Sequence, residues 1–123
     1  MTTRILFVED DEELQEIYAS MLGAHDYQIV LAYDGVDALE RLEEARPDLI
    51  VLDIILDEIM GDDFFVRIKQ DARYAEIPVV VVSALPAERS QPMIAMDPTT
   101  AFLRKPFGRR QLLEAIEKGL SAS

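Results

Sequence analysis

Polar side chains that could do chemistry stand at the ends of short apolar runs in this 123-residue sequence; they are Glu9, Asp10, Asp53, Ser83 and Lys105. Carboxylates that converge repel one another unless a cation neutralises them, and a hard cation such as Mg²⁺ is bound through oxygen. A lysine ammonium and a serine hydroxyl can bind phosphoryl oxygens, and a firmly held aspartate can attack phosphorus. If the fold brings them together, these side chains predict a magnesium site at which Asp53 accepts a phosphoryl group.

The apolar runs alternate with amphipathic stretches, a pattern that predicts five strands separated by helices. The predicted strands are 4–8, 27–32, 49–52, 78–82 and 101–104, and the predicted helices are 11–22, 34–45, 62–70 and 107–120. This alternation predicts an α/β fold with a doubly wound parallel sheet, because parallel strands need crossovers that place helices on both faces. Ligands bind such sheets beyond the carboxyl ends of the strands, where the polar side chains stand.

Helical spacing predicts which apolar side chains of each helix face the core. They are Leu14, Ile17, Tyr18, Met21 and Leu22 in the first helix, Val36, Leu39 and Leu42 in the second, and Leu112, Leu113 and Ile116 in the last. A fourth helix is expected between the last two strands, but Pro86, Pro92 and Pro98 lie there. Because an interior proline costs about 3 kcal/mol, this helix is predicted to be short or distorted.

Composition narrows the class of protein. Half of the residues are hydrophobic, which permits a packed core, and the absence of cysteine excludes disulfides and thiolate metal sites and favours the cytoplasm. The net charge of −12 disfavours binding to nucleic acid or anionic lipid. At the N-terminus an apolar run of only four residues, 5–8, precedes the first acids, so neither a signal peptide nor a membrane span is predicted.

Four stretches carry a family resemblance: ILFVEDD, DLIVLDIILDEIMG, VVVVSA and FLRKPF. In this order, with 30 positions from Asp53 to Ser83 and 22 from Ser83 to Lys105, they resemble the receiver domain of bacterial two-component response regulators. The resemblance covers the whole chain and implies a single receiver domain over residues 1–123. It also implies a flavodoxin-like sheet with strand order 2-1-3-4-5.

The resemblance implies a role for each residue at the strand ends. Asp53 would be the phospho-acceptor, and Glu9, Asp10 and the backbone carbonyl of Ile55 would bind Mg²⁺ with it. Ser83 and Lys105 would hold the phosphoryl oxygens. The protein would then catalyse only its own phosphorylation and dephosphorylation.

Two further positions are implied to respond to the phosphoryl group. Ser83 would move toward it, and Phe102 on the fifth strand would turn inward behind it, so that one arrangement of packed elements is favoured. The peptide between Lys105 and Pro106 is expected to be cis, although only about 5 % of such bonds are.

Protein partners are expected on both sides of the reaction. The single histidine, His25, follows a helix stop and is predicted to lie in a surface loop, so the phosphodonor should be a separate histidine kinase or phosphotransfer protein. In the family the face made by helix four, strand five and helix five often contacts downstream partners. Basic residues predict that this face prefers an acidic partner surface; they are Arg89, Arg104, Arg109 and Arg110.

Some positions depart from the family pattern, and other readings stay open. Asp57 stands where proline is common, and Met60 where an aspartate or asparagine is common. A pseudo-receiver that binds partners without phosphorylation is one alternative. A magnesium-dependent aspartate phosphatase is disfavoured because Ile55 replaces its second acid, and a nucleotide-binding protein because no glycine-rich loop follows the first strand. The chain ends after the last helix, as in a stand-alone receiver, but excision from a longer protein is left open.

Overall fold

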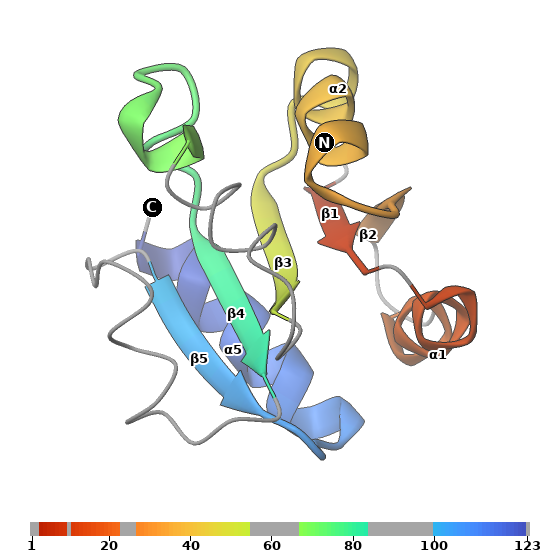
Figure 1. Cartoon of the computed structure of the whole chain (residues 1–123). Helices are drawn as coiled ribbons and strands as arrows, with labels where there is room; N and C mark the ends of the chain where they lie inside the picture. The colour runs from red at the N-terminus through yellow and green to blue at the C-terminus, as the bar shows by residue number, and fades with distance from the viewer. Residues whose placement is uncertain (1–2, 10, 23–26, 55–66, 84–99, 123) are drawn as a thin grey trace.

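A parallel five-stranded sheet forms the centre of the protein (Figure 1). The computed structural model describes residues 3–9, 11–22, 27–54, 67–83 and 100–122. The strands are β1 (Thr3–Val8), β2 (Tyr27–Ala32), β3 (Leu49–Ile54), β4 (Val79–Ser83) and β5 (Thr100–Arg104). Their order is β2-β1-β3-β4-β5, which confirms the predicted α/β sheet with order 2-1-3-4-5.

Three labelled helices connect or follow these strands: α1 (Glu12–Leu22), α2 (Gly35–Ala45) and α5 (Arg109–Ala122). Residues 67–70 are also helical and belong to the predicted third helix; the rest of that helix, and the predicted short fourth helix, lie outside the described residues. In the part of the chain that the structure describes, no helix is both long and apolar enough to cross a membrane.

Local side-chain contacts set where the helices begin and end. The Asp34 carboxylate accepts a hydrogen bond from the Asp37 N–H at 2.8 Å and caps α2, and Arg46 ends that helix in the left-handed conformation with φ 48°. The last helix begins at Arg109 rather than at the predicted residue 107. The reason is that the Gly108 carbonyl accepts the first helical bond from Leu112, 3.2 Å away.

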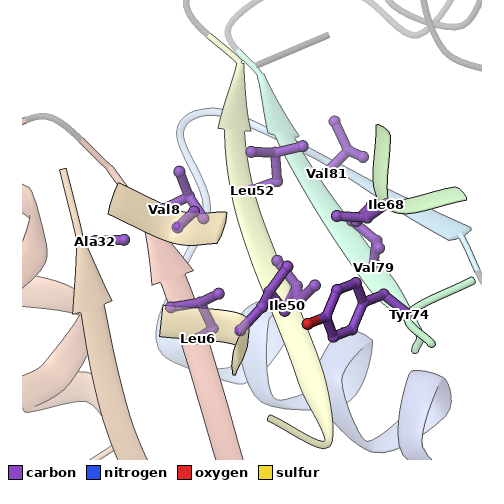
Figure 2. Close-up of a cluster of buried hydrophobic side chains, with 11 residues drawn as sticks. Leu6, Val8, Ala32, Ile50, Leu52, Ile68, Tyr74, Val79 and Val81 are labelled. Atoms are coloured by element: carbon purple, nitrogen blue, oxygen red, sulfur yellow. The ribbon is translucent and has the colours of Figure 1, made fainter. Parts of the chain in front are cut away.

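The core has two layers, one on each face of the sheet, because alternate residues of a strand point to opposite faces. In β3, Ile50 and Leu52 pack on the side of α2 and Tyr74, as Figure 2 shows. Leu49 and Val51 pack on the side of α1 and α5. The run Val79 to Val82 is fully buried on both sides, as its unbroken apolar pattern predicts.

Two helix residues predicted to face the core do not. Ile17 is 43 % exposed and Val36 is 66 % exposed. In α1 the buried positions are Gln15, Tyr18 and Leu22, a narrow stripe that leaves Ile17 on the outer side. The apolar stripe read from the sequence is therefore wider than the face that α1 buries, and a glutamine occupies a place inside it.

Strand register aligns the carboxyl ends of β1, β3, β4 and β5. Val8 pairs with Leu52, Asp53 with Val82, and Ser83 with Arg104. Strand β3 continues to Ile54, beyond the predicted end at residue 52, so Asp53 lies inside the strand. Glu9 follows β1 and Lys105 follows β5, which brings residues far apart in sequence to one edge of the sheet.

Candidate functional site

Three charged side chains meet at the carboxyl edge of the sheet. Lys105 Nζ donates a hydrogen bond to Asp53 Oδ2 at 2.5 Å and lies 3.9 Å from Glu9 Oε1. Glu9 and Asp53 are buried, with 3 % and 7 % of their surface exposed. The structure thus brings together three of the predicted site residues, from β3 and from the segments that follow β1 and β5.

Burial gives this cluster its electrostatic character. Two carboxylates taken out of water are costly unless positive charge or hydrogen-bond donors compensate them. The Lys105 ammonium supplies one such charge, and the Asp11 N–H donates a hydrogen bond to Glu9 Oε2 at 3.1 Å. With two acids and one base, the described cluster keeps a negative excess that suits a further cation.

One oxygen of Asp53 has the surroundings that a metal would complete. Asp53 Oδ1 is buried, and no residue in the described ranges donates a hydrogen bond to it. A buried, unpaired carboxylate oxygen next to a second acid is a fitting donor for a hard cation. The described residues contain no set of three side chains able to hold a metal, and two predicted ligands, Asp10 and the Ile55 carbonyl, lie outside them.

The remaining predicted positions lie on the same strands. Ser83 is the last residue of β4 and pairs with Arg104 of β5, and Phe102 pairs with Val81. Their side chains are not among those described, so their movements stay predictions. The Lys105–Pro106 peptide is cis, as expected.

An aromatic stack near the acidic cluster was not predicted as part of the site. The Tyr18 ring stacks on Phe7 with centroids 5.5 Å apart and on Phe107 with centroids 5.7 Å apart. Burial raises the pKa of Tyr18 well above its ordinary value, and the nearby charges of Asp53 and Glu9 raise it further. Helical spacing assigns Tyr18 to the core but does not show that its phenol lies within the electrostatic influence of two carboxylates.

A buried glutamine was also missed. The Gln15 side-chain amide donates hydrogen bonds to the carbonyl oxygens of Glu9 at 2.7 Å and Ala32 at 3.3 Å. The only signal in the sequence was a polar residue three positions before Tyr18 and seven before Leu22, on the stripe that the helix buries.

Comparison with known proteins gives a consistent result. The sequence matches the response regulator receiver domain family over residues 5–117. It is 30 % identical over 118 residues to the sensor histidine kinase TmoS of Ectopseudomonas mendocina, covering 96 % of this chain and 12 % of that protein. It is 29 % identical over 120 residues to the polar-differentiation response regulator DivK of Brucella ovis, covering 98 % of both. The chain also spans 7 % of the hybrid signal transduction histidine kinase D of Dictyostelium discoideum.

Solved structures share the fold. The chemotaxis protein CheY4 of Vibrio cholerae superposes with a TM-score of 0.87 at 22 % identity, covering 98 % of this chain and 100 % of that one. The receiver domain of sensor histidine kinase PA1611 from Pseudomonas aeruginosa has a TM-score of 0.83 at 26 % identity and covers 98 % and 99 %. That structure contains a magnesium ion in its active site cleft.

Proposed function

Because this chain belongs to the family of response regulator receiver domains, we propose that it signals by accepting a phosphoryl group on Asp53. Membership of this family makes the chain a module of two-component signalling. The assignment of Asp53 as the residue that accepts the phosphoryl group is what we propose. The contact that carries the proposal is the hydrogen bond between Lys105 Nζ and Asp53 Oδ2, in a buried pair at the carboxyl edge of the sheet. The proposal treats residues 1–123 as one receiver domain.

The reaction is a phosphoryl transfer from a phosphorylated histidine. One carboxylate oxygen of Asp53 forms a bond to phosphorus while the bond from phosphorus to the donor imidazole nitrogen breaks. The electron pair of the broken bond stays on that nitrogen, which takes a proton from water. The products are an acyl phosphate on Asp53 and a neutral histidine. Water later hydrolyses the acyl phosphate, which restores the Asp53 carboxylate and releases inorganic phosphate. In this proposal the protein catalyses its own phosphorylation and dephosphorylation and is otherwise not an enzyme.

Lys105 and Ser83 are the proposed partners of the transferred group. The 2.5 Å contact from Lys105 to Asp53 supports this role, because an ammonium beside the acceptor can bind a phosphoryl oxygen as negative charge builds up. Ser83 ends the strand next to β3 and pairs with Ile54, one residue beyond Asp53. A hydroxyl at that position is a suitable donor to a second oxygen.

Magnesium is the proposed cofactor, and the described residues fit it. Glu9 and Asp53 are buried acids, and Oδ1 of Asp53 accepts no hydrogen bond from the described residues. We assign Glu9, Asp10, Asp53 and the Ile55 carbonyl to the metal. When bound, Mg²⁺ neutralises charge on the carboxylates and the phosphoryl oxygens.

The response to phosphorylation is proposed to run through Ser83 and Phe102. A phosphoryl group that draws Ser83 toward Asp53 would leave space that the ring of Phe102 fills. Such a device shifts the population between two packed arrangements rather than creating a new fold. The strand register supports a coupling between Ser83 and Phe102, since Phe102 pairs with Val81 in the strand that ends at Ser83.

The partners follow from this chemistry. The donor is a histidine kinase or phosphotransfer protein in the cytoplasm. The output surface is the face formed by β5 and α5 with the fourth helix, which lies outside the described residues. Exposed Arg104, Arg109 and Arg110 on the described part favour an acidic protein surface. Direct contact with nucleic acid or membrane is not part of the proposal, because the net charge is −12.

Intact-mass measurement after treatment with acetyl phosphate and Mg²⁺ tests the acceptor. The parent should gain one phosphoryl group, and Asp53→Asn should gain none because its amide is not nucleophilic. Asp48→Asn is the matched control: Asp48 is exposed and accepts a hydrogen bond from the Arg4 N–H at 2.9 Å, which an asparagine oxygen can also accept. This variant should be labelled like the parent.

Two outcomes would contradict the proposal. Labelling of Asp53→Asn at the parent level would place the acceptor elsewhere. A parent that is folded, binds Mg²⁺ and takes no label from acetyl phosphate or from a phosphorylated phosphotransfer protein would instead support the pseudo-receiver alternative.

A further inference from the structure

Gln15 is a polar residue in a place where α1 otherwise buries apolar side chains. Gln15 is 3 % exposed and lies on the same stripe as Tyr18 and Leu22. A buried amide is costly unless it is hydrogen-bonded, so its partners should explain why it is there. The amide donates to two backbone carbonyls at the carboxyl edge of the sheet, beside the acidic cluster.

The first partner is the peptide that joins the two predicted acidic ligands. The Gln15 amide donates to the Glu9 carbonyl at 2.7 Å, and that carbonyl belongs to the peptide between Glu9 and Asp10. On the other side of Glu9, its N–H donates to the Ala32 carbonyl at 2.9 Å. Both peptides that flank Glu9 are therefore hydrogen-bonded.

The second partner ties the same amide to β2. Gln15 reaches the Ala32 carbonyl at 3.3 Å, which is the oxygen that also accepts from the Glu9 N–H. One side chain thus connects α1, the end of β2 and the segment after β1. Rotation of the peptide between Glu9 and Asp10 would break the shorter of these bonds.

The orientation of this peptide matters because, together with the hydrogen bond of the Glu9 N–H, it fixes the backbone from which the Glu9 side chain extends. Glu9 Oε1 already lies 3.9 Å from Lys105 Nζ, and Glu9 Oε2 accepts from the Asp11 N–H at 3.1 Å. A turn of the peptide that follows Glu9 would shift the Glu9 carboxylate and alter its contact with the Asp11 N–H. Mutation of a neighbour that orients a metal ligand commonly weakens metal binding by about 10–100-fold.

We infer that Gln15 is a positioning residue of the magnesium site: its buried amide holds the carbonyl of Glu9, and so helps to fix the backbone from which the Glu9 carboxylate reaches the cation. This inference rests on the proposed function, since it needs the metal site. It assigns to Gln15 no contact with the metal or the phosphoryl group. Its effect should appear in metal affinity rather than in the chemical step.

Calorimetric titration of the purified, unphosphorylated protein with Mg²⁺ tests the inference. Gln15→Met keeps the length and removes the donor, and its dissociation constant for Mg²⁺ should rise about tenfold. Gln28→Met is the matched control, because Gln28 is exposed on β2 and its Oε1 accepts from Arg4 Nε at 3.1 Å. This control should bind Mg²⁺ like the parent, within about twofold.

A kinetic readout separates positioning from a general loss of structure. In phosphorylation by acetyl phosphate, the half-saturating Mg²⁺ concentration of Gln15→Met should rise about tenfold. The rate at saturating Mg²⁺ should stay within about twofold of the parent, because the acceptor and Lys105 are unchanged. Urea unfolding without Mg²⁺ shows how far the fold itself is weakened. If Gln15→Met does not fold, Gln15→Asn, whose amide is one methylene shorter, serves for the same comparison.

The outcomes separate the inference from the function on which it rests. An unchanged Mg²⁺ affinity in a folded Gln15 variant overturns the positioning role and leaves the metal site intact. A lower maximal rate with unchanged affinity also overturns it. A parent that shows no response to Mg²⁺ removes the proposed metal site itself, and the inference with it.

Discussion

Ion pairs at the two ends of the sheet differ in burial, and this decides what each can do. At the carboxyl end, Lys105 and Asp53 have side chains that are 27 % and 3 % exposed. Near the amino end of β4, Arg73 and Asp71 pair at 2.9 Å, but their side chains are 64 % and 32 % exposed. Water screens the second pair, whereas the first lies against another buried acid, Glu9.

Burial distinguishes a charge pair that the protein can lose from one that it needs. Hydrogen bonds from Arg73 lower the pKa of Asp71 below its ordinary value, yet both groups would be well solvated if separated. At the carboxyl end the loss of one partner leaves an uncompensated charge inside the protein. The exposed pair can therefore be lost with little effect on stability, whereas the buried acids need the positive charge of Lys105.

The largest effect is expected for Lys105→Met in the absence of Mg²⁺. Removing the ammonium leaves Glu9 and Asp53 buried without its charge, and the free energy of unfolding should fall by about 2–3 kcal/mol, since Lys105 is partly exposed. Urea unfolding measures this loss. Added Mg²⁺ should recover more stability in the variant than in the parent, because it binds the folded state and supplies the missing charge.

Arg73→Met is the matched control for this prediction. It also removes a basic partner of an aspartate, but at the exposed end, and its urea midpoint should equal that of the parent within error. If the two variants lost equal stability, burial would not be what distinguishes the two ends of the sheet.

The next largest effect is on the pH dependence of stability, through Tyr18, whose pKa responds to the charges of the buried acids. Burial and the charges of Asp53 and Glu9 raise the pKa of Tyr18, so the folded state keeps its proton where the unfolded state loses it. The contribution of Tyr18 to the free energy of unfolding is fully present below its pKa in the unfolded state, about 10. It is lost as the pH rises toward the pKa of Tyr18 in the folded state. Between pH 10 and 11 the parent should lose up to about 1.4 kcal/mol more than Tyr18→Phe.

Urea unfolding of both proteins at pH 8, 10 and 11 checks this, since the two proteins differ only at position 18. Below the unfolded pKa of about 10, the free energy of unfolding should change with pH almost equally in the two proteins. If it also changed equally above that pH, the Tyr18 phenol would not be held in its neutral form by the site.

The smallest effect tests packing at the amino end of the sheet. A Cβ added at Gly119 would lie 2.8 Å from Leu49 Cδ1 and 3.4 Å from Pro78 Cβ, so α5 approaches the starts of β3 and β4 closely there. Gly119→Ala should cost about 1 kcal/mol, because overpacking outweighs the better helix propensity of alanine.

A double-mutant cycle with Leu49→Ala sharpens this prediction. Removing the leucine opens space, so Gly119→Ala should cost nothing or should stabilise the protein in that background. An equal cost in both backgrounds would show that the contact with Leu49 is not the cause. This end of the sheet would then be shaped by something other than close packing.

Much of the fold could be predicted because it depends on local patterns. The run Val79 to Val82 predicts a strand buried on both faces, and Asp34 predicts the start of a helix; both are confirmed. The exposed positions of Ile17 and Val36 could not be predicted, since helical spacing shows which residues share a face but not how much of that face a neighbour covers.

For the site, the residue types alone show which chemistry is available: acids, a hydroxyl and an amine after apolar runs. They do not show that Lys105 contacts Asp53 across 52 positions, or that Gln15 and Tyr18 lie near the acids; these contacts follow from how the segments pack together. The physical reason is that residue types and their spacing act over a few positions along the chain. Contacts between distant segments depend on strand register and on how helices pack against the sheet.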